Sequence, residues 1–209
     1  MATAAPWAMI MARILDMGTA MAMGISIFMA DDRLKLHQWL SPAFPIGGFG
    51  YSQGLEEPMA TGIIRTAADV EAWVTAILCR GSARTDAIIL AHARSGTDCQ
   101  MLSDLILSYA SCAERETELM EQGRAFCALI GGITGAELPL LPYPVAVGVA
   151  TASLNLATQE VLALFLHGSA AQMISAHGEI TQDVLDLLGP RASVQVQDVP
   201  RLVPGTISL

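Results

Sequence analysis

The sequence predicts an all-α fold, a single-domain helical bundle with a structured Pro/Gly loop near its N-terminus. Apolar residues recur at the three- and four-residue spacing of amphipathic helices along most of the 209-residue chain. Helix-capping residues and helix-ending glycines separate these stretches. Only the C-terminal tail, where Val194 and Val196 alternate with polar residues, resembles a β-strand. The length suits one domain with a sizeable core and is short for two.

The N-terminal 30 residues are rich in methionine and poor in polar side chains. Their apolar run, Met17–Ala30, is shorter than the ~20 residues that span a bilayer. We interpret residues 1–30 as an N-terminal extension, either disordered or read from a misassigned start, with a secretory signal as the alternative. Residues 31–189 are the predicted helical domain, and residues 190–209 are a tail.

The folded part begins with apolar residues at helical spacing, among them Leu36 and Leu40. Residues 41–54 cannot form a regular helix, because they contain two prolines and four glycines. They are the predicted structured loop. A short helix follows the loop and ends near Gly62.

Thr66 and Asp69 resemble a capping box, in which each residue satisfies a backbone amide of the other. The apolar residues from Val70 to Leu78 then follow the spacing of one helical face. A second helical piece follows Gly81 and extends to about Arg94.

Asp98 is a candidate N-cap for the next helix. Residues 99–130 are predicted to form one long helix, with Met101 and Tyr109 on its apolar face, and Gly131 and Gly132 are predicted to end it. The remaining predicted helices span residues 145–156, 158–176 and 181–188.

The composition is unusually apolar: 53% of the residues are hydrophobic and 15% are charged, against the ordinary ~25% charged. A monomer of this composition has difficulty covering its surface, which favours burial against another subunit. The alternative is an alanine- and methionine-rich core. The cysteines are widely spaced, without a CxxC pair, which predicts free thiols in a reducing, cytoplasmic setting. They are Cys79, Cys99, Cys112 and Cys127.

The net charge is −9 and Lys35 is the single lysine. A nucleic-acid binder needs a basic face to neutralise phosphates, and docking on an anionic membrane needs one as well, so both classes are excluded. No P-loop is present, because Lys35 precedes the glycine-rich loop. The acidic balance suits a basic or metal-handling partner, with solubility as the alternative reason for it.

The four histidines give little indication of a metal site. His37, His92, His167 and His177 are scattered, and no two lie four residues apart on one helical face. We therefore predict no metal site built by a single chain and no bound cofactor. A site shared between subunits is the alternative.

One catalytic pattern is present: residues 50–54 fit GxSxG, with Ser52 as the nucleophile. In α/β-hydrolases this motif requires a strand that enters a strained turn before a helix. Here Pro42 and Pro45 precede it and no parallel sheet is predicted. A serine hydrolase using Ser52 is thus the alternative function.

The most charged segment of the chain spans residues 113–124. Arg115 can pair with Glu118, and Glu121 with Arg124, at the i, i+3 spacing of a helix. An ordinary solvated face is the simplest interpretation. Gly123, however, is unfavourable inside a helix by ~1 kcal/mol relative to alanine, which indicates close packing or a bend beside it.

Four segments in order resemble the UreF family of urease accessory proteins. They are Leu36–Glu56, Glu114–Arg124, Pro142–Gly148 and Phe165–Ala176. The sequence departs from the family's pattern at Gly50 and Gln53, where the family commonly has serine and histidine. It is also shortened after Ala176, in a region that the resemblance assigns to contact with the accessory protein UreD.

The resemblance implies an all-helical, usually dimeric chaperone without enzymatic activity. Such a protein joins UreD (also called UreH) and the GTPase UreG to insert nickel into apo-urease, and the nickel ligands belong largely to these partners. The residues implied in partner binding lie in two segments: Ser41, Pro42, Phe44, Pro45, Gly47, Gly48, Tyr51, Ser52, Gly54 and Glu56 in the loop, and Arg115, Glu116, Gly123 and Arg124 in the later helix. For Phe44, Phe49 and Tyr51, a role in the core is an equal alternative.

Overall fold

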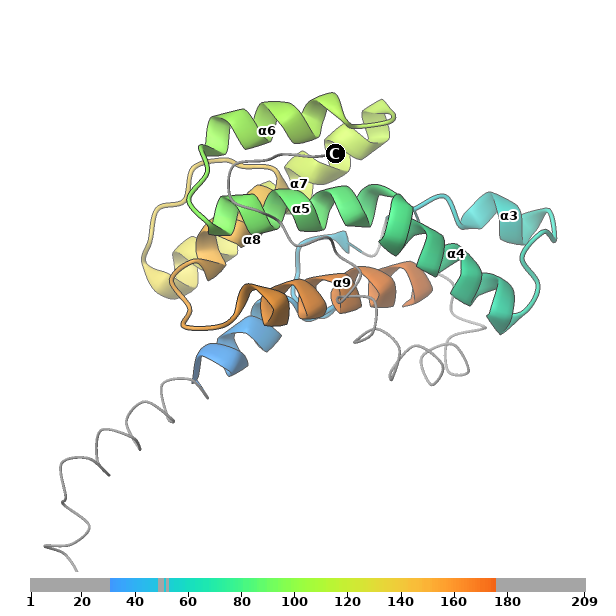
Figure 1. Cartoon of the computed structure of the whole chain (residues 1–209), viewed down its shortest axis with the longest axis horizontal. Helices are drawn as coiled ribbons and strands as arrows, with labels where there is room; N and C mark the ends of the chain where they lie inside the picture. Colours follow the sequence, from blue (N-terminus) through green and yellow to red (C-terminus); the bar gives the residue numbers. More distant parts are fainter. Residues whose placement is uncertain (1–30, 49–50, 52, 176–209) are drawn as a thin grey trace, which may run out of the picture.

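The computed structural model describes residues 31–48, 51 and 53–175. The predicted extension, the helix over residues 181–188 and the tail over residues 190–209 lie outside these residues. Within them the fold is all-α, as predicted, and contains no strand. Residues 31–39 are helical. The labelled helices in Figure 1 are α3 (Glu56–Ala60), α4 (Ala67–Arg80), α5 (Ser82–Arg94), α6 (Cys99–Ser108), α7 (Ala113–Thr134), α8 (Tyr143–Thr151) and α9 (Thr158–Ser175).

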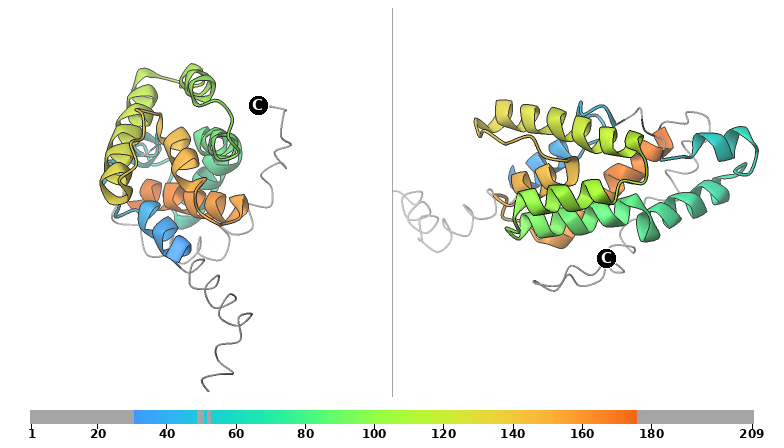
Figure 2. Two further views of the ribbon diagram at one scale, coloured as in Figure 1. Left: turned by 90° about the vertical axis from the view of Figure 1, so that its left-hand side faces the viewer. Right: turned by 90° about the horizontal axis from the view of Figure 1, so that it is seen from above.

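Helices α5 and α8 form the centre of the bundle. Figures 1 and 2 show α8 between α5 and α7, while α4, α6 and α9 pack against the other sides of α5. Residues 141–148 are all buried, which explains why their sequence is apolar without a polar face. The two central helices approach closely at Gly148, where a Cβ would lie 2.6 Å from the Leu90 carbonyl oxygen.

The predicted helix starts at Thr66 and Asp98 are confirmed. Thr66 Oγ accepts a hydrogen bond from the Asp69 amide, and the Asp69 carboxylate accepts one from the Thr66 amide at 2.9 Å, which completes the capping box of α4. The Asp98 carboxylate accepts from the Met101 amide at 2.8 Å at the start of α6.

The prediction of one long helix over residues 99–130 is wrong, because the chain forms two helices there. Helix α6 ends at Ser108, and α7 begins at Ala113 after Cys112 in an extended conformation. Leu119, a buried residue of α7, follows the buried Ile106 by 13 positions, which is about 3.6 turns of an α-helix. A single straight helix would turn one of these apolar faces away from the core. Tyr109 is accordingly 53% exposed.

The prediction that Gly131 and Gly132 end this helix is wrong, because both lie within α7. The helix extends to Thr134, and Gly135, with φ of 72°, closes it by donating its amide to the Gly131 carbonyl at 2.9 Å. Gly132 has open space around its Cα, so it gives no steric reason for the helix to stop.

Helix α8 ends at Thr151, five residues before the predicted end at Leu156. The Arg94 guanidinium donates to the carbonyl oxygens of Thr151, Leu154 (3.1 Å) and Leu156 (2.5 Å). These carbonyls would be needed for helical hydrogen bonds if α8 continued. Arg94 therefore stabilises a turn in place of a last helical turn.

The first described helix is joined to the turn between α8 and α9. The buried carboxylate of Asp32 accepts from the Asn155 amide at 2.9 Å, and Arg33 pairs with Glu160 at 2.6 Å. The Arg33 pair is exposed and contributes little to stability. The Asp32 contact is buried at the carboxylate, so it fixes where this helix meets the bundle.

The four cysteines predicted as free thiols have free thiols in the structure. In the part of the chain that the structure describes, no helix combines the length and the apolar character that crossing a membrane requires.

Gly123 lies at the closest contact between α7 and the segment that enters α8. A Cβ at this position would lie 2.0 Å from the Leu141 carbonyl oxygen and 2.8 Å from the Tyr143 amide nitrogen. Both are backbone atoms, which cannot move aside as the end of a flexible side chain can. The close packing predicted beside this glycine is therefore confirmed.

We expect Gly123→Ala to lower the free energy of unfolding by about 2–3 kcal/mol or more, because α7 must separate from α8. Gly132→Ala is the matched control in the same helix. It adds the same methyl group to open space, and its better helix propensity predicts no loss or a gain of up to ~1 kcal/mol. Urea unfolding monitored by circular dichroism measures both. Equal effects of the two substitutions would contradict the packing argument.

Candidate functional site

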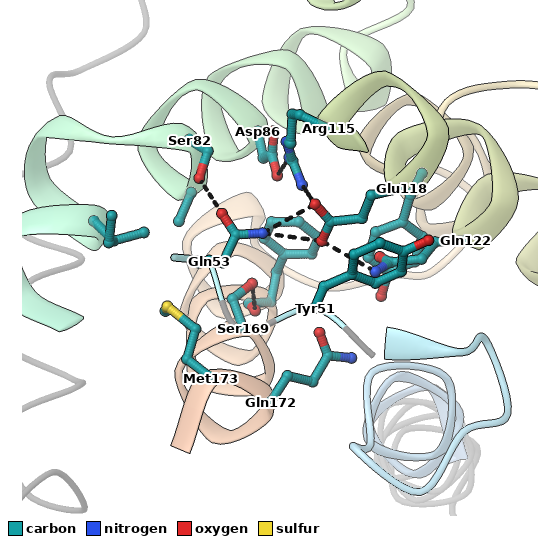
Figure 3. Close-up of a pocket in the computed structure, with 14 residues that line it drawn as sticks. Tyr51, Gln53, Ser82, Asp86, Arg115, Glu118, Gln122, Ser169, Gln172 and Met173 are labelled. Carbon is teal, nitrogen blue, oxygen red and sulfur yellow. Dashed lines mark hydrogen bonds and ion pairs between the residues drawn. The ribbon is translucent and has the colours of Figure 1, made fainter. Parts of the chain in front are cut away.

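The two segments implied in partner binding meet in the structure, although they are far apart in the sequence. Figure 3 shows the Gln53 side chain pointing from the loop toward Glu118 of α7. Gln53 Nε2 donates to both carboxylate oxygens of Glu118, at 2.9 and 3.0 Å. Gln53 Oε1 accepts from the Ser82 hydroxyl of α5 at 2.7 Å. One glutamine side chain therefore joins the loop to two helices.

Arg115 pairs with two carboxylates beneath this contact. Its Nη1 donates to Glu118 at 2.5 Å, as the i, i+3 spacing predicted, and its Nη2 donates to Asp86 of α5. The side chains of Arg115, Asp86 and Glu118 are only 12%, 13% and 8% exposed. Gln122 completes the surroundings of Glu118 by donating at 3.2 Å. For Glu118, the interpretation as part of an ordinary solvated face is thus wrong.

We call Gln53, Ser82, Asp86, Arg115, Glu118 and Gln122 the polar cluster. It borders a cavity of about 30 Å³ that α4, α5, α7, α8, α9 and the loop line together. This volume holds about two water molecules. Pockets for small-molecule substrates are usually ~300–1,000 Å³, so the cavity is too small to be one.

Burial and charge shift several ionisation equilibria in and around the polar cluster. Burial raises the pKa of Asp86 to about 6 although Arg115 opposes the shift. Burial acts to lower the pKa of Arg115, but the carboxylates of Asp86 and Glu118 outweigh it and raise that pKa. Burial and the nearby Asp86 raise the pKa of the Tyr143 phenol. The guanidinium of Arg115 therefore stays charged across the physiological range.

The remaining residues implied in partner binding differ in their exposure. Phe44 is in the core, where its ring packs edge-on against Phe126 with centroids 6.0 Å apart, whereas Tyr51 is partly exposed. Gly48 and Gly123 are also buried, and Ser41 and Pro42 are partly exposed. The exposed members are Pro45, Gly47, Gly54, Glu56, Glu116 and Arg124. Phe49 and Ser52 lie outside the described residues.

Four members of the polar cluster were not found from the sequence. Gln122 lies four residues after Glu118, a spacing at which side chains interact on a helix, so it could have been found. Ser82 and Asp86 are each 29 residues from their partners in the cluster. Neither a motif nor a spacing indicates such a contact. Gln53 was noted only as a departure from the family's pattern.

The described residues before Ser52 do not have the strand that a nucleophile elbow requires. Residues 31–39 are helical, residues 40–47 form turns and bends, and residue 48 is in a 3-10 conformation, so no strand is present from residue 31 to residue 48. Over the described ranges, no group of three or more His, Cys, Asp or Glu side chains is placed to hold a metal ion.

A second hollow lies along the C-terminal half of α7. It is an open groove of about 460 Å³ between α7 and the connector to α8, and Arg124, Cys127 and Leu140 are among the residues that line it. Leu140 and Ile133 are exposed, at 51% and 53%.

Comparison with known proteins identifies relatives over most of the described chain. The family model for UreF matches residues 64–177. The protein named urease accessory protein UreF from Cereibacter sphaeroides strain ATCC 17025 is 54% identical over 143 residues, which are 68% of each chain. Proteins of the same name from Agrobacterium fabrum and Dinoroseobacter shibae are 44% identical over 151 residues and 40% identical over 143 residues, and each match again covers 68% of both chains.

We expect Glu118→Ala to lower the free energy of unfolding by about 2–4 kcal/mol, because Arg115, Gln53 and Gln122 lose their common acceptor inside the protein. Glu116→Ala is the matched control. Glu116 lies in the same helix but is exposed, so its removal should change stability by less than about 0.5 kcal/mol. Urea unfolding compares the two. A Glu118 variant as stable as the Glu116 variant would show that the buried carboxylate has no structural role.

We also expect Asp86 to make stability depend on pH. Because its pKa in the folded protein, about 6, is above the ordinary 3.8, the folded state binds more protons than the unfolded state between these values. The stability that this shift contributes is complete below the unfolded pKa and is lost as the pH rises through the folded pKa. The free energy of unfolding of the wild type, relative to Asp86→Asn, should therefore fall between about pH 4 and about pH 7. Urea unfolding at a series of pH values measures it, and a rising difference would contradict the shift.

Proposed function

The chain belongs to the UreF family of urease accessory proteins, and we propose that it acts as a chaperone that joins UreD/UreH and the GTPase UreG to insert nickel into apo-urease. The family is one of accessory proteins and not of enzymes. In this role the chain recruits or regulates the GTPase, and nickel is the cargo of the assembly. We further propose that it works in the cytoplasm as a homodimer.

One observation supports the proposed docking surface above all: the loop and the start of α7 are joined at Gln53 and Glu118. The two segments that we propose to bind partners are separate in the sequence and become neighbours through this contact. Gly54, next to Gln53 in the loop, and Glu116, two residues before Glu118 in α7, are both exposed. We call the exposed residues Pro45, Gly47, Gly54, Glu56, Glu116 and Arg124 the docking surface.

The packing of the loop favours this role. Phe44 and Ile46 are buried, at 8% and 4% exposure, while Pro45 and Gly47 beside them are exposed. A loop that is anchored in the free protein loses little conformational entropy when a partner binds. Anchored apolar residues that alternate with exposed ones are therefore suited to recognition.

The composition supports the homodimer, and the cysteines support the cytoplasm. The apolar fraction of 53% and charged fraction of 15% favour a subunit interface. The free thiols of Cys79, Cys99, Cys112 and Cys127 are typical of a reducing compartment.

We expect the chain, co-expressed with UreD and UreG from the same organism, to co-purify with both in one complex by size exclusion with light scattering. The double variant Glu116→Arg, Arg124→Glu reverses both charges and keeps the net charge of the chain. It should weaken the complex by about tenfold or more, since charged groups at the rim of an interface control association. Asp104→Arg, on the exposed side of α6, is the control and should co-purify as the wild type does. A wild-type chain that binds neither protein would refute the proposed function. Equal binding by all variants would refute the docking surface alone.

A further inference from the structure

The two halves of the loop are held to the bundle in different ways. The first half has apolar anchors, because Phe44 and Ile46 are buried in the core. In the second half, the described residues Tyr51, Gln53 and Gly54 are partly or fully exposed. A Cβ added at Gly54 would lie 3.9 Å from the Trp73 ring of α4. Among these described residues, Gln53 joins the loop to two helices through its side chain, with hydrogen bonds to Glu118 of α7 and Ser82 of α5.

Both ends of the Gln53 amide are engaged, as Figure 3 shows. The nitrogen donates to the two oxygens of Glu118, and the oxygen accepts from Ser82. The reversed amide would place an oxygen against a carboxylate, so only one orientation satisfies both contacts. The side chain thus fixes the loop relative to α5 and α7 together.

The backbone of Gln53 is in an unusual conformation. Its φ of 52° lies in the left-handed region, and it is the only non-glycine residue with positive φ in the described part of the chain. Side chains with a Cβ disfavour this region. Such a conformation persists where the surrounding contacts determine it, and here those contacts are the hydrogen bonds to Glu118 and Ser82.

We propose that Gln53 is a positioning residue for the docking surface: its amide sets the placement of Gly54 in the loop and Glu56 at the start of α3 relative to Glu116 in α7. This inference rests on the proposed function for its consequence in partner binding. Its structural part, the fixing of the loop by Gln53, concerns the chain alone.

The charge of the polar cluster explains why one amide is sufficient. Glu118 is also the acceptor for Arg115 and Gln122, and Arg115 is in turn paired with Asp86. The carboxylate that Gln53 contacts is therefore also held by Arg115 and Gln122 of α7, and through Arg115 it is linked to Asp86 of α5. A hydrogen bond to such an ionised, immobile acceptor is stronger and more directional than one to a mobile surface group.

Two substitutions at position 53 separate the side-chain contact from the backbone conformation. Asparagine and histidine both tolerate the left-handed region better than most residues do. Asparagine is shorter than glutamine by one carbon–carbon bond, about 1.5 Å, so its amide cannot reach Glu118. Histidine places its Nε2 about as far from the backbone as glutamine places its amide nitrogen, and can donate to Glu118.

The first measurement uses the chain alone. The amide of Tyr51, which donates to the Gly48 carbonyl at 3.3 Å, reports on the second half of the loop by hydrogen exchange in NMR. We expect Gln53→Asn to accelerate its exchange by about tenfold or more, with Gln53→His near the wild type. The amide of Ile89 in the buried centre of α5 serves as the internal control and should be unchanged in both variants.

The second measurement is the affinity of the same variants for the complex of UreD and UreG. We expect Gln53→Asn to bind at least about tenfold more weakly and Gln53→His to bind as the wild type does, at a temperature where circular dichroism shows both variants to be fully folded. The proposal would be overturned if Gln53→Asn left both the exchange at Tyr51 and the affinity unchanged. It would also be overturned if partial unfolding of Gln53→Asn accounted for its loss of affinity. If the wild type binds neither partner, the proposed function fails, and the exchange at Tyr51 still decides whether Gln53 fixes the loop.

Discussion

The carboxylate of Glu118 lies inside the protein, and a buried charge must be surrounded by donors. Gln53, Arg115 and Gln122 supply them from the loop and from α7 itself. Arg115 brings a second carboxylate, Asp86, into the same region from α5. Much of the architecture around the loop follows from this requirement, because each donor is in place only when its own element is correctly packed. The polar cluster therefore constrains the relative placement of the loop, α5 and α7 more closely than the apolar contacts alone do.

Buried ion pairs are not an efficient source of stability, since the desolvation of the charges offsets most of their attraction. Apolar side chains of similar volume could hold α5 and α7 together equally well. The polar cluster adds hydrogen bonds, which depend on direction as apolar contacts do not. Leucine and valine would permit several placements of the loop at similar free energy, whereas the fixed oxygens of Glu118 accept the Gln53 amide from one side. We interpret the cluster as a device that selects one loop position rather than one that raises the overall stability.

The sequence was sufficient for features that depend on neighbours along the chain. The capping box at Thr66, the N-cap at Asp98, the pairing of Arg115 with Glu118 and the close packing at Gly123 each depend on residues within a few positions or on one residue's own properties. The sequence does not indicate the division between α6 and α7, because apolar residues continue through it. That the apolar faces of α6 and α7 are out of phase is clear only once the position of the core relative to both helices is known. Asp86 and Ser82 were missed because their partners are distant in the sequence, so the pattern around them is that of an ordinary helix.

The same contrast explains why the sequence predicted the two segments of the candidate site but not the contact that joins them. Resemblance indicated the loop and the charged helix as two surfaces, but it did not indicate that one amide joins them. Glu118 was interpreted as part of an ordinary solvated face, because a helical repeat shows which residues share a face and not which of them is covered. The covering element is the loop, and it reaches Glu118 through Gln53, at a position where the sequence differs from the family's common residue. A departure from the family's pattern thus falls at the contact between the loop and α7. If this contact positions the loop as we propose, the residue at position 53 has to keep a donor at the right distance from Glu118.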